Sequence, residues 1–360
     1  MKALAQGITL LVLLWSSALV SAQQKVPFAG DRVVTVMSQN VYNGVDAELA
    51  AVVAAKNPGE LVTAVASVYD GYFKRNFPER AAAIAAEVEA TQPALIGLQE
   101  AILVRTQTPS DPNTPATMVE LDYVQILLDA LAARGMHYEV VVQSINFDAE
   151  LPSAYGSDVR HTDREVILAR SDLKTADLKL SNAQGGSFVN NCVINGLVGP
   201  ITIRRGWVAV DVKIRGKSFR LISTHLDNGC PQPNPFGVQT AQAGEILSGP
   251  AATKLPIILV GDFNSPGDGS GPTYSSVIAA GFDDAAVEAG VGHLPTCCQA
   301  PNLLNPSSTL DQRIDFVLFR GPFEVQGAET VGASNADRTP SGLWPSDHAG
   351  ITATLELAHP

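Results

Sequence analysis

Residues 255–269, LPIILVGDFNSPGDG, join a run of aliphatic side chains to an abrupt polar turn. A short apolar run of this kind, bounded by Pro and Gly, predicts a buried strand over 255–260. The residues that follow, Asp262, Asn264 and the Ser-Pro-Gly-Asp-Gly stretch, have the composition of a turn. Taken alone, they need no role beyond forming that turn.

Polar side chains at or beside apolar runs recur along the chain. Besides 255–269, the pattern occurs in VVTVMSQN (33–40), PALIGLQE (93–100), RLISTHLD (220–227), QRIDFVLF (312–319) and PSDHAG (345–350). These segments supply Asn40, Glu100, His225, Asp227, Asp315, Asp347 and His348. For any one of them, a structural hydrogen bond is an adequate explanation. If the strand ends meet at one edge of a sheet, however, all of these side chains share one cleft.

Carboxylates gathered in one cleft need a compensating charge. Burying an unpaired carboxylate costs several kcal/mol unless a cation or hydrogen bonds offset that cost. Oxygen donors without a Cys or His cluster suit a hard cation, so we expect Mg²⁺, with Mn²⁺ or Ca²⁺ as alternatives. A divalent cation beside two histidines and several carboxylates is equipped for metal-assisted hydrolysis of a phosphoester.

The other periodic patterns predict an α/β fold rich in strands. Strands are expected over 32–38, 94–98, 138–143, 165–170, 206–214, 218–223, 255–260, 314–319 and 350–357, and 206–214 and 218–223 are expected to form a hairpin around Gly216. Helices are expected over 47–55, 61–73, 78–91 and 118–134. Many strands with few crossover helices favour packed, largely antiparallel sheets over a doubly wound parallel sheet. Because the chain contains neither an internal repeat nor an obvious linker, we expect one domain.

Residues 1–22 have the features of a secretory signal peptide. An early Lys2 precedes an apolar stretch, and the VSA sequence at 20–22 fits the small-x-small rule for cleavage. The alternative is an N-terminal membrane anchor, since the apolar run is almost long enough to span a bilayer. We therefore expect cleavage near Ala22, a domain over 23–360, and a secreted or periplasmic location.

The chain has four cysteines, Cys192, Cys230, Cys297 and Cys298. In an exported protein, cysteines are expected to be oxidised to disulfides. Three pairings are open, and Cys297 and Cys298 either bond to each other or each reach one of the other two. A zinc site is the alternative, which the absence of a CxxC spacing disfavours.

Six motifs occur in an order that is typical of one family: SQNVY (38–42), IGLQE (96–100), THLDN (224–228), GDFN (261–264), RIDFVL (313–318) and SDHAG (346–350). Together they closely resemble the signature blocks of the endonuclease/exonuclease/phosphatase superfamily. That superfamily includes pancreatic-type deoxyribonucleases, abasic-site endonucleases, inositol polyphosphate 5-phosphatases and neutral sphingomyelinases. The resemblance implies a four-layer α/β sandwich of two packed mixed sheets with helices outside. Against this pattern, the helical stretch around 45–75 is an insertion.

The resemblance also implies a metal site and a phosphate site. Glu100 would be the main metal ligand, with Asn40 and Asp347 completing the site directly or through water. Arg164 would match a phosphate-binding arginine of the nuclease branch, with a solvated surface arginine as the alternative.

The catalytic roles follow from the same resemblance. Asp262 would act as general acid or base near the attacking water, and Asn264 would orient that water or a phosphate oxygen. His225 would contact the scissile phosphate and stabilise charge in the transition state. Asp315 would hydrogen-bond His348 and favour its protonated form. Whether Asp262 or His348 takes the proton stays open. The implied reaction is in-line attack of water on phosphorus without a covalent intermediate.

The sequence implies the type of reaction but leaves several classes of substrate open. We expect a phosphodiesterase acting on nucleic acid or a phospholipid headgroup, with transient membrane contact in the latter case and no obligate protein partner. A net charge of −12 argues against a broad electrostatic grip on nucleic acid, although arginines at 160, 164, 204 and 205 could form a local patch. A membrane-docking ridge could come from Tyr69, Tyr72, Phe73 and Phe77, unless these aromatics belong to the core.

Two other functions remain as alternatives. A phosphomonoesterase of the inositol-phosphate kind would need a dense Lys/Arg pocket, which the sequence does not reveal. A non-catalytic binding scaffold would be expected to have lost at least one of Glu100, Asp262, Asp315 and His348, and all four are present.

Overall fold

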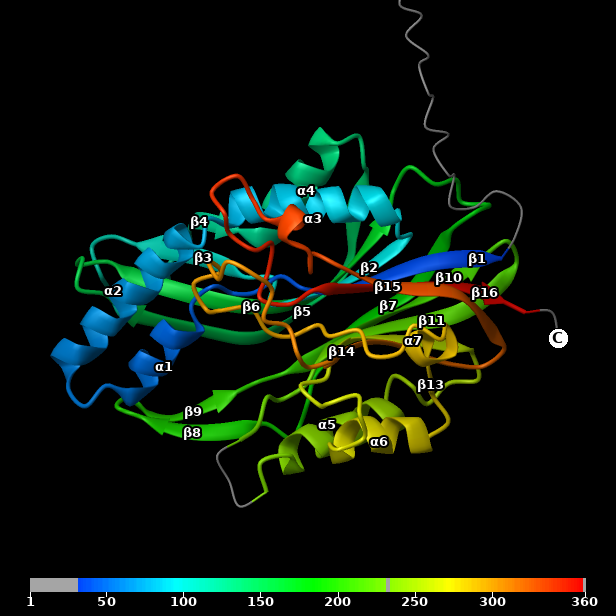
Figure 1. The fold of residues 1–360 in the computed structure, drawn as a ribbon. Coiled ribbons are helices and arrows are strands. Elements are labelled where there is room, and N and C mark those ends of the chain that lie inside the picture. The colour runs from blue at the N-terminus through cyan, green and yellow to red at the C-terminus, as the bar shows by residue number, and fades with distance from the viewer. Residues whose placement is uncertain (1–31, 231–233, 359–360) are drawn as a thin grey trace, which may run out of the picture.

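The computed structural model describes residues 32–230 and 234–358. These residues form two β-sheets packed face to face, with helices on the outer face of each sheet (Figure 1). The predicted four-layer α/β sandwich is therefore confirmed. The segment 1–22, for which a signal peptide is predicted, lies outside the described residues. In the part of the chain that is described, no helix combines the length and apolar character needed to cross a bilayer.

Sheet A has eight strands in the described residues. They are β1 (Val33–Asn40), β2 (Leu95–Gln99), β3 (Leu103–Gln107), β4 (Met118–Asp122), β5 (Tyr138–Pro152), β6 (Asp158–Arg170), β15 (Phe323–Val331) and β16 (Gly350–Leu357). Their order is β15-β16-β1-β2-β6-β3-β4, and β5 pairs with β6. Strands β1 and β2 run parallel, whereas the other neighbours run antiparallel.

Sheet B has six strands in the described residues. They are β7 (Lys179–Ser187), β10 (Gly206–Ile214), β11 (Lys217–His225), β12 (Ile257–Asp262), β13 (Asp283–Asp284) and β14 (Asp315–Arg320), in the order β13-β14-β12-β11-β10-β7. Strands β11 and β12 run parallel, and β10 and β11 form the predicted hairpin. A separate hairpin of β8 (Cys192–Gly196) and β9 (Gly199–Ile203) belongs to neither sheet.

Helices cover both sheets. They are α1 (Asp46–Ala54), α2 (Pro58–Lys74), α3 (Phe77–Thr91), α4 (Tyr123–Ala133), α5 (Gly237–Ser248), α6 (Pro272–Ala279), the short α7 (Ala285–Glu288) and the 3-10 turn η1 (Asn335–Asp337). Helices α3 and α4 lie over sheet A, whereas α5 and α6 lie over sheet B (Figure 1). Helices α1 and α2 occupy the segment around 45–75 that was predicted as a helical insertion.

The two sheets approach each other closely at Gly97 of β2. A Cβ atom built there would lie 2.6 Å from Ser223 Oγ and 2.7 Å from Val260 Cγ2, both on sheet B. The next inward residue, Gln99, donates from Nε2 to Ser223 Oγ at 3.0 Å. Because any larger side chain at position 97 would push the sheets apart, this glycine keeps the ends of β1 and β2 near the ends of β11 and β12.

The predicted helix over 118–134 was wrong in its first turn. Residues 118–122 form β4, an edge strand paired with β3, and the helix begins only at Tyr123. Asp122 caps that helix, because its side chain accepts hydrogen bonds from the backbone N–H of Val124 and Gln125. This cap residue marks the start of the helix, which the continuous run of helix-forming residues did not indicate.

The four aromatics considered as a membrane ridge do not form one. Tyr72 and Phe77 are fully buried in the core between sheet A and its covering helices, and Tyr69 is packed against that core. Of the four, Phe73 is the exposed ring, at 46% of its surface. The core explanation is therefore the correct one for most of this group.

The open question of the cysteine pairing has a clear answer in the structure. Cys192 is bonded to Cys230, and Cys297 to Cys298. The first disulfide ties the β8–β9 hairpin to the segment that follows β11, and the second lies at the wall of the cavity described below.

Removing the Cys192–Cys230 disulfide should lower the free energy of unfolding by about 4 kcal/mol, because the bond closes a loop with a sequence separation of 38 residues. Urea unfolding of a double serine variant, without reductant, measures this. A double serine variant at Cys297 and Cys298 is the matched control, since a bond between adjacent residues closes almost no loop. Equal losses in the two variants would contradict the assignment.

Candidate active site

Three candidate residues form one row across sheet B. His225 is opposite Asp262 between the parallel strands β11 and β12, and Asp262 is opposite Asp315 between β12 and β14. All three side chains are buried. Because neighbouring strands are about 4.8 Å apart, residues in one register across adjacent strands lie within reach of common partners. The strand ends thus gather the groups as the sequence pattern suggested.

The glycine of the GDFN motif explains why strand β12 ends as it does. Gly261 has φ +149, and a Cβ at this position would collide with the carbonyl oxygen of Thr224 on β11. Glycine therefore lets the strand deliver Asp262 beside the end of β11. Asn264 then turns the chain with φ 50, a conformation that Asn tolerates, and its N–H donates to Asp262 Oδ1 at 2.8 Å.

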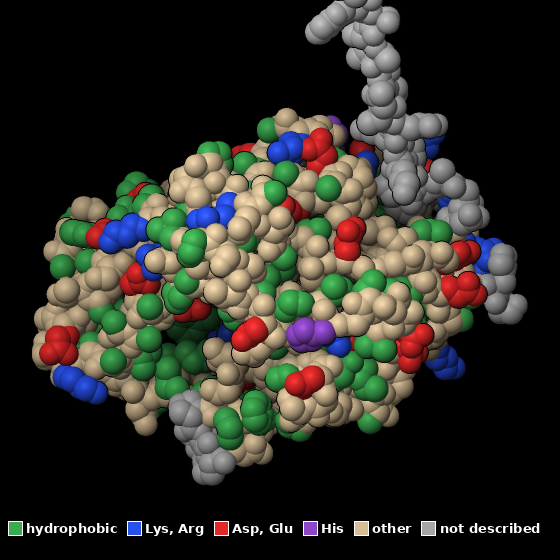
Figure 2. All heavy atoms as spheres, viewed as in Figure 1, with side chains coloured by type: hydrophobic (Ala, Val, Ile, Leu, Met, Phe, Trp, Pro, Cys, Tyr) green, Lys and Arg blue, Asp and Glu red, His purple; other side chains and the backbone are tan. Residues whose placement is uncertain are grey.

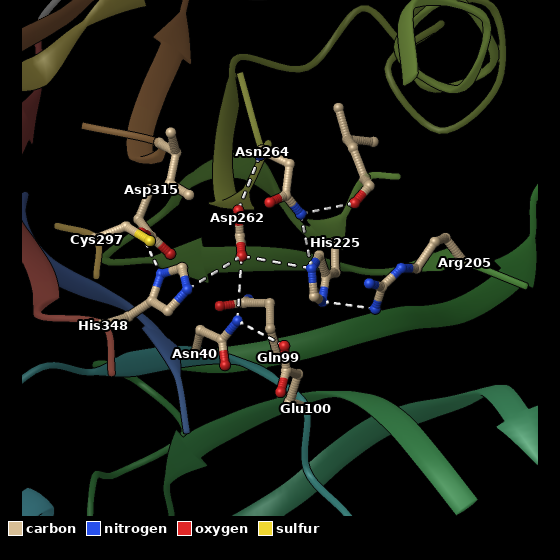
Figure 3. A network of polar contacts seen from close by, with 12 residues as sticks. Asn40, Gln99, Glu100, Arg205, His225, Asp262, Asn264, Cys297, Asp315 and His348 are labelled. Carbon is tan, nitrogen blue, oxygen red and sulfur yellow. Dashed lines mark hydrogen bonds and ion pairs between the residues drawn. The ribbon is translucent and has the colours of Figure 1, made fainter. Parts of the chain in front are cut away.

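His348 lies between two carboxylates (Figure 3). Its Nδ1 donates to Asp315 Oδ2 at 2.8 Å, and its Nε2 lies 3.8 Å from Asp262 Oδ2. Burial lowers the pKa of His348, but Asp315, Asp347 and Asp262 more than offset this and hold the pKa well above its ordinary value. The imidazole is therefore held as a cation with Nε2–H directed toward the cavity side of the row.

Asp262 is the carboxyl group best poised for proton transfer. Burial, followed by repulsion from Asp315, raises its pKa to about 7, while His348 acts in the opposite direction. The side chain also accepts a hydrogen bond from Asn40 Nδ2 at 3.1 Å. A base whose pKa is close to the operating pH is the most effective kind for general acid–base catalysis.

His225 is held as a neutral donor. Its Nδ1 lies 3.0 Å from a guanidinium nitrogen of Arg205, and since arginine can only donate, Nδ1 must accept. Burial, the charge of Arg205 and that of His348 lower the pKa of His225 well below its ordinary value. The proton of the neutral ring is therefore on Nε2, which lies 3.0 Å from the amide nitrogen of Asn264 and 3.4 Å from Asp262 Oδ2.

Glu100 is anchored by two asparagines at the end of β2. Asn40 Nδ2 donates to Glu100 Oε1 at 3.1 Å, and Asn43 donates to Oε2 from its backbone N at 2.7 Å and from Nδ2 at 2.6 Å. Glu100 itself has φ 57, a left-handed conformation that costs free energy for a side chain of this size. The site therefore holds this carboxylate in place against local strain.

Asn40 is oriented differently from what a metal ligand requires. Its amide nitrogen bridges Glu100 and Asp262, and its Oδ1 accepts the backbone N–H of Tyr42 at 2.9 Å. A cation binds an amide through oxygen, so in this arrangement Asn40 links the two carboxylates rather than offering them a third oxygen ligand. Its predicted role in the metal site stays a prediction.

The carboxylates at this end of the cavity fit a hard cation. Glu100, Asp46 and Asp347 all line the cavity. Burial raises the pKa of Asp347 well above its ordinary value, and Glu100 and Asp46 raise it further. Carboxylates that disfavour one another's charge in this way are the usual environment of a divalent cation, which stabilises their ionised forms.

Arg164 does not have the surroundings of a phosphate ligand. Its side chain is buried, donates to the carbonyl oxygens of Ala101 and Ile102 at 2.7 and 3.2 Å, and pairs with Asp122. It is also absent from the described lining of the cavity. The phosphate-binding role suggested by the sequence is therefore corrected: Arg164 braces the start of β3 and the cap of α4.

Arg205 and Asn43 are the site residues that the sequence motifs did not reveal. Arg205 follows β9, outside every motif, and reaches His225 and, at 3.6 Å, Asp163. Asn43 lies just beyond the SQNVY block and holds Glu100. An arginine directly before strand β10 carries no recognisable signal, since its partner His225 is distant in sequence.

Six of the predicted residues line a single cavity of about 550 Å³. They are Glu100, His225, Asp262, Asn264, Asp347 and His348. Asn40 and Asp315 stand behind this row and contact it through the hydrogen bonds given above. The arrangement joins a base, a fixed cation, a neutral donor and a carboxylate cluster in one space, which is the equipment for hydrolysis of a phosphoester.

A family model described as "Endonuclease/Exonuclease/phosphatase family" matches residues 37–348. The chain belongs to this family. Members of the endonuclease/exonuclease/phosphatase family are phosphoester hydrolases that generally depend on a metal ion. The resemblance inferred from the six motifs is thereby confirmed, together with the fold that it implied.

Solved structures of the same family share the fold. A family protein from Bacteroides thetaiotaomicron is 17% identical, with a TM-score of 0.55 over 91% of this chain and 99% of that one. The mannosyl-6-phosphatase Bt3783 from the same species is also 17% identical, with a TM-score of 0.53 over 89% and 99%.

TDP2 from D. rerio, solved in complex with a single-strand DNA product, is 15% identical, with a TM-score of 0.53 over 91% of this chain and 100% of that one. Among curated proteins, no sequence matches the chain significantly. At these identities the likeness establishes the fold and leaves the substrate to be argued from the site.

Proposed function

We propose that this protein is an exported, Mg²⁺-dependent phosphodiesterase that cleaves P–O bonds by in-line attack of water. The observation that carries the proposal is the buried network that joins Asp262 to His348 on one side and, through an asparagine bridge, to Glu100 on the other. This network places a proton acceptor, a positive charge and a metal-binding carboxylate around one space.

Each residue has a defined part in the proposed reaction. Asp262 takes the proton from the attacking water, because its pKa lies near neutrality. His348 stays protonated and stabilises the negative charge that develops on phosphorus. His225 donates from Nε2 to a phosphoryl oxygen, and Asn264 orients the water or the phosphate. A divalent cation held by Glu100 and Asp347, once bound, supplies further charge stabilisation at the phosphoryl group.

The alternatives account less well for the cavity. Among its described lining residues, Arg204 and Arg205 are the basic ones, which is too few for an inositol polyphosphate. A binding scaffold would not need the raised pKa values of Asp262 and His348. The mannosyl-6-phosphatase and the DNA-bound TDP2 indicate that this fold serves both monoesters and nucleic acid, so the ester type must be tested directly.

Chelation should abolish activity on bis(p-nitrophenyl) phosphate, and Mg²⁺ should restore it, because the carboxylate cluster cannot act on phosphorus without its cation. The assay uses residues 23–360 with Mg²⁺ or Mn²⁺, with EDTA, and with p-nitrophenyl phosphate in parallel. Faster turnover of the monoester would replace the diesterase by a monoesterase. Equal inertness of the wild-type protein and His348→Ala with every metal would support the scaffold.

Export rests on the sequence of residues 1–22 alone. Expression of the full chain, followed by N-terminal sequencing of the protein recovered outside the cytoplasm, tests it. A mature terminus just after Ala22 would support the proposal, whereas an uncleaved chain held in the membrane fraction would favour the anchor.

A further inference from the structure

The cavity continues from the catalytic residues into a part lined by apolar side chains. Val53 of α1, Val65 and Val68 of α2, Phe147 and Leu151 of β5, and Ile201 of β9 form its walls, which we call the apolar chamber. Figure 2 shows the hollow at the surface, with hydrophobic side chains in its walls. One cavity thus has a charged end, where phosphorus would react, and an apolar end.

Two walls of the apolar chamber come from elements outside the two sheets, and the third comes from β5 of sheet A. Helices α1 and α2 occupy the segment that the sequence predicted as an insertion, and the β8–β9 hairpin belongs to neither sheet. Val65 and Val68 are buried in the core between sheet A and its covering helices, and the Cys192–Cys230 disulfide fixes the base of the hairpin. Because both walls are anchored, the chamber is already formed before a substrate binds. Little conformational entropy of the protein is therefore lost when an apolar group enters it.

The charges around the cavity exclude a polyanionic substrate. Its described lining has six carboxylates, Asp46, Glu100, Glu150, Asp163, Asp262 and Asp347, against the two arginines already named and the imidazolium of His348. Of those two, Arg205 is engaged by His225 and Asp163. A metal ion compensates one phosphate group at the catalytic end, but the rest of a nucleic acid strand would meet further negative charge.

We propose that the apolar chamber holds the single hydrophobic chain of the substrate, so that the enzyme cleaves phosphoesters of one-chain amphiphiles. This inference rests on the proposed function. Since the cavity of about 550 Å³ must also contain the phosphate group, it has room for one drug-sized apolar group and not for the two chains of a bilayer lipid. Burial of the substrate's hydrophobic chain against the apolar side chains contributes binding free energy, and the catalytic row recognises the phosphate.

A series of alkyl p-nitrophenyl phosphate diesters tests the chamber. With methyl, butyl, octyl and dodecyl members, each kept monomeric and assayed with Mg²⁺, kcat/KM should rise roughly fourfold per methylene until the chamber is full, as expected for full transfer of each group from water. Equal kcat/KM across the series overturns the chamber proposal but keeps the proposed function. Hydrolysis of no member overturns the proposed function itself.

Chamber variants locate the effect. Ala149→Trp, on β5, should block the chamber, and Ile201→Asn should make its wall polar, since both residues line it. Each should lower kcat/KM for the octyl ester by at least tenfold and leave the methyl ester within about twofold, so the methyl rate reports folding. Val193→Asn is the matched control on the same hairpin, because Val193 is exposed and does not line the cavity.

A last experiment distinguishes a soluble one-chain phosphoester from a two-chain membrane lipid as the substrate. Monomeric dodecyl ester is compared with vesicles of phosphatidylcholine and of sphingomyelin at equal phosphate concentration. A strong preference for the monomeric ester supports the one-chain chamber. Faster turnover of either two-chain lipid overturns the chamber proposal. The proposal is also overturned if Val193→Asn lowers the ratio of kcat/KM for the octyl ester to that for the methyl ester as much as Ile201→Asn does.

Discussion

Replacing Asp262 with Asn should lower kcat/KM for a phosphodiester by about a thousandfold, the range in which general-base catalysis contributes. The amide has the size of the carboxyl and still accepts the N–H of Asn264, but it cannot take a proton from water. Because the loss is one of chemistry and not of packing, kcat should fall while KM stays nearly unchanged. Steady-state kinetics with saturating Mg²⁺ measure this.

The pH profile separates this role from a structural one. A base must be ionised to act, so activity of the wild-type protein should be full above the pKa of Asp262, about 7, and be lost as the pH falls through it. A bound cation stabilises the carboxylate and moves this limb to lower pH. The residual activity of Asp262→Asn should lack the acidic limb altogether.

Asp227→Asn is the matched control for Asp262. Asp227 is also a buried carboxyl that follows β11, yet it does not line the cavity and accepts a hydrogen bond from the backbone N–H of Gly229 at 3.0 Å. Its replacement should leave the pH profile unchanged. A value of kcat/KM for Asp262→Asn within tenfold of the wild type would rule out Asp262 as the base.

Replacing His348 with Asn should also cost about a thousandfold in kcat, because it removes the cation that three carboxylates hold in place. Asp315→Asn should cost less, on the order of tenfold to a hundredfold, since the ring remains but loses the acceptor that orients Nδ1. The double variant should be no worse than His348→Asn alone, because the two residues act as one unit.

His161→Gln provides the control for His348. His161 lines the same cavity and is hydrogen-bonded to the hydroxyl of Tyr72. Burial lowers the pKa of His161 to about 4, so the ring carries no charge at neutral pH. Its loss should change kcat by less than tenfold. Equal damage from the two histidine variants, or full additivity of His348→Asn and Asp315→Asn, would show that the Asp315–His348 pair is not the source of the positive charge.

Local patterns were enough to find most of the strands and the helices near the N-terminus. The aliphatic run before Asp262, the hairpin around Gly216 and the final strand 350–357 all read correctly, because buried strands and tight turns have residue preferences of their own. The strands that were not predicted are β3, β4, β8, β9, the two-residue β13 and, most notably, β7 and β15. The residues of β7 and β15 are half-exposed and mixed in polarity, so they form strands only because a neighbouring strand pairs with them.

By itself the sequence identified the family and the groups proposed to carry the chemistry, because each of these polar residues belongs to a short motif and the order of the motifs is typical of the family. Only the tertiary structure decided how those groups are arranged. The shared register of His225, Asp262 and Asp315, the tautomer imposed by Arg205 and the bracing role of Arg164 depend on partners far apart in the chain. Hydrogen bonds and charge interactions depend on distance in space, which a motif does not contain.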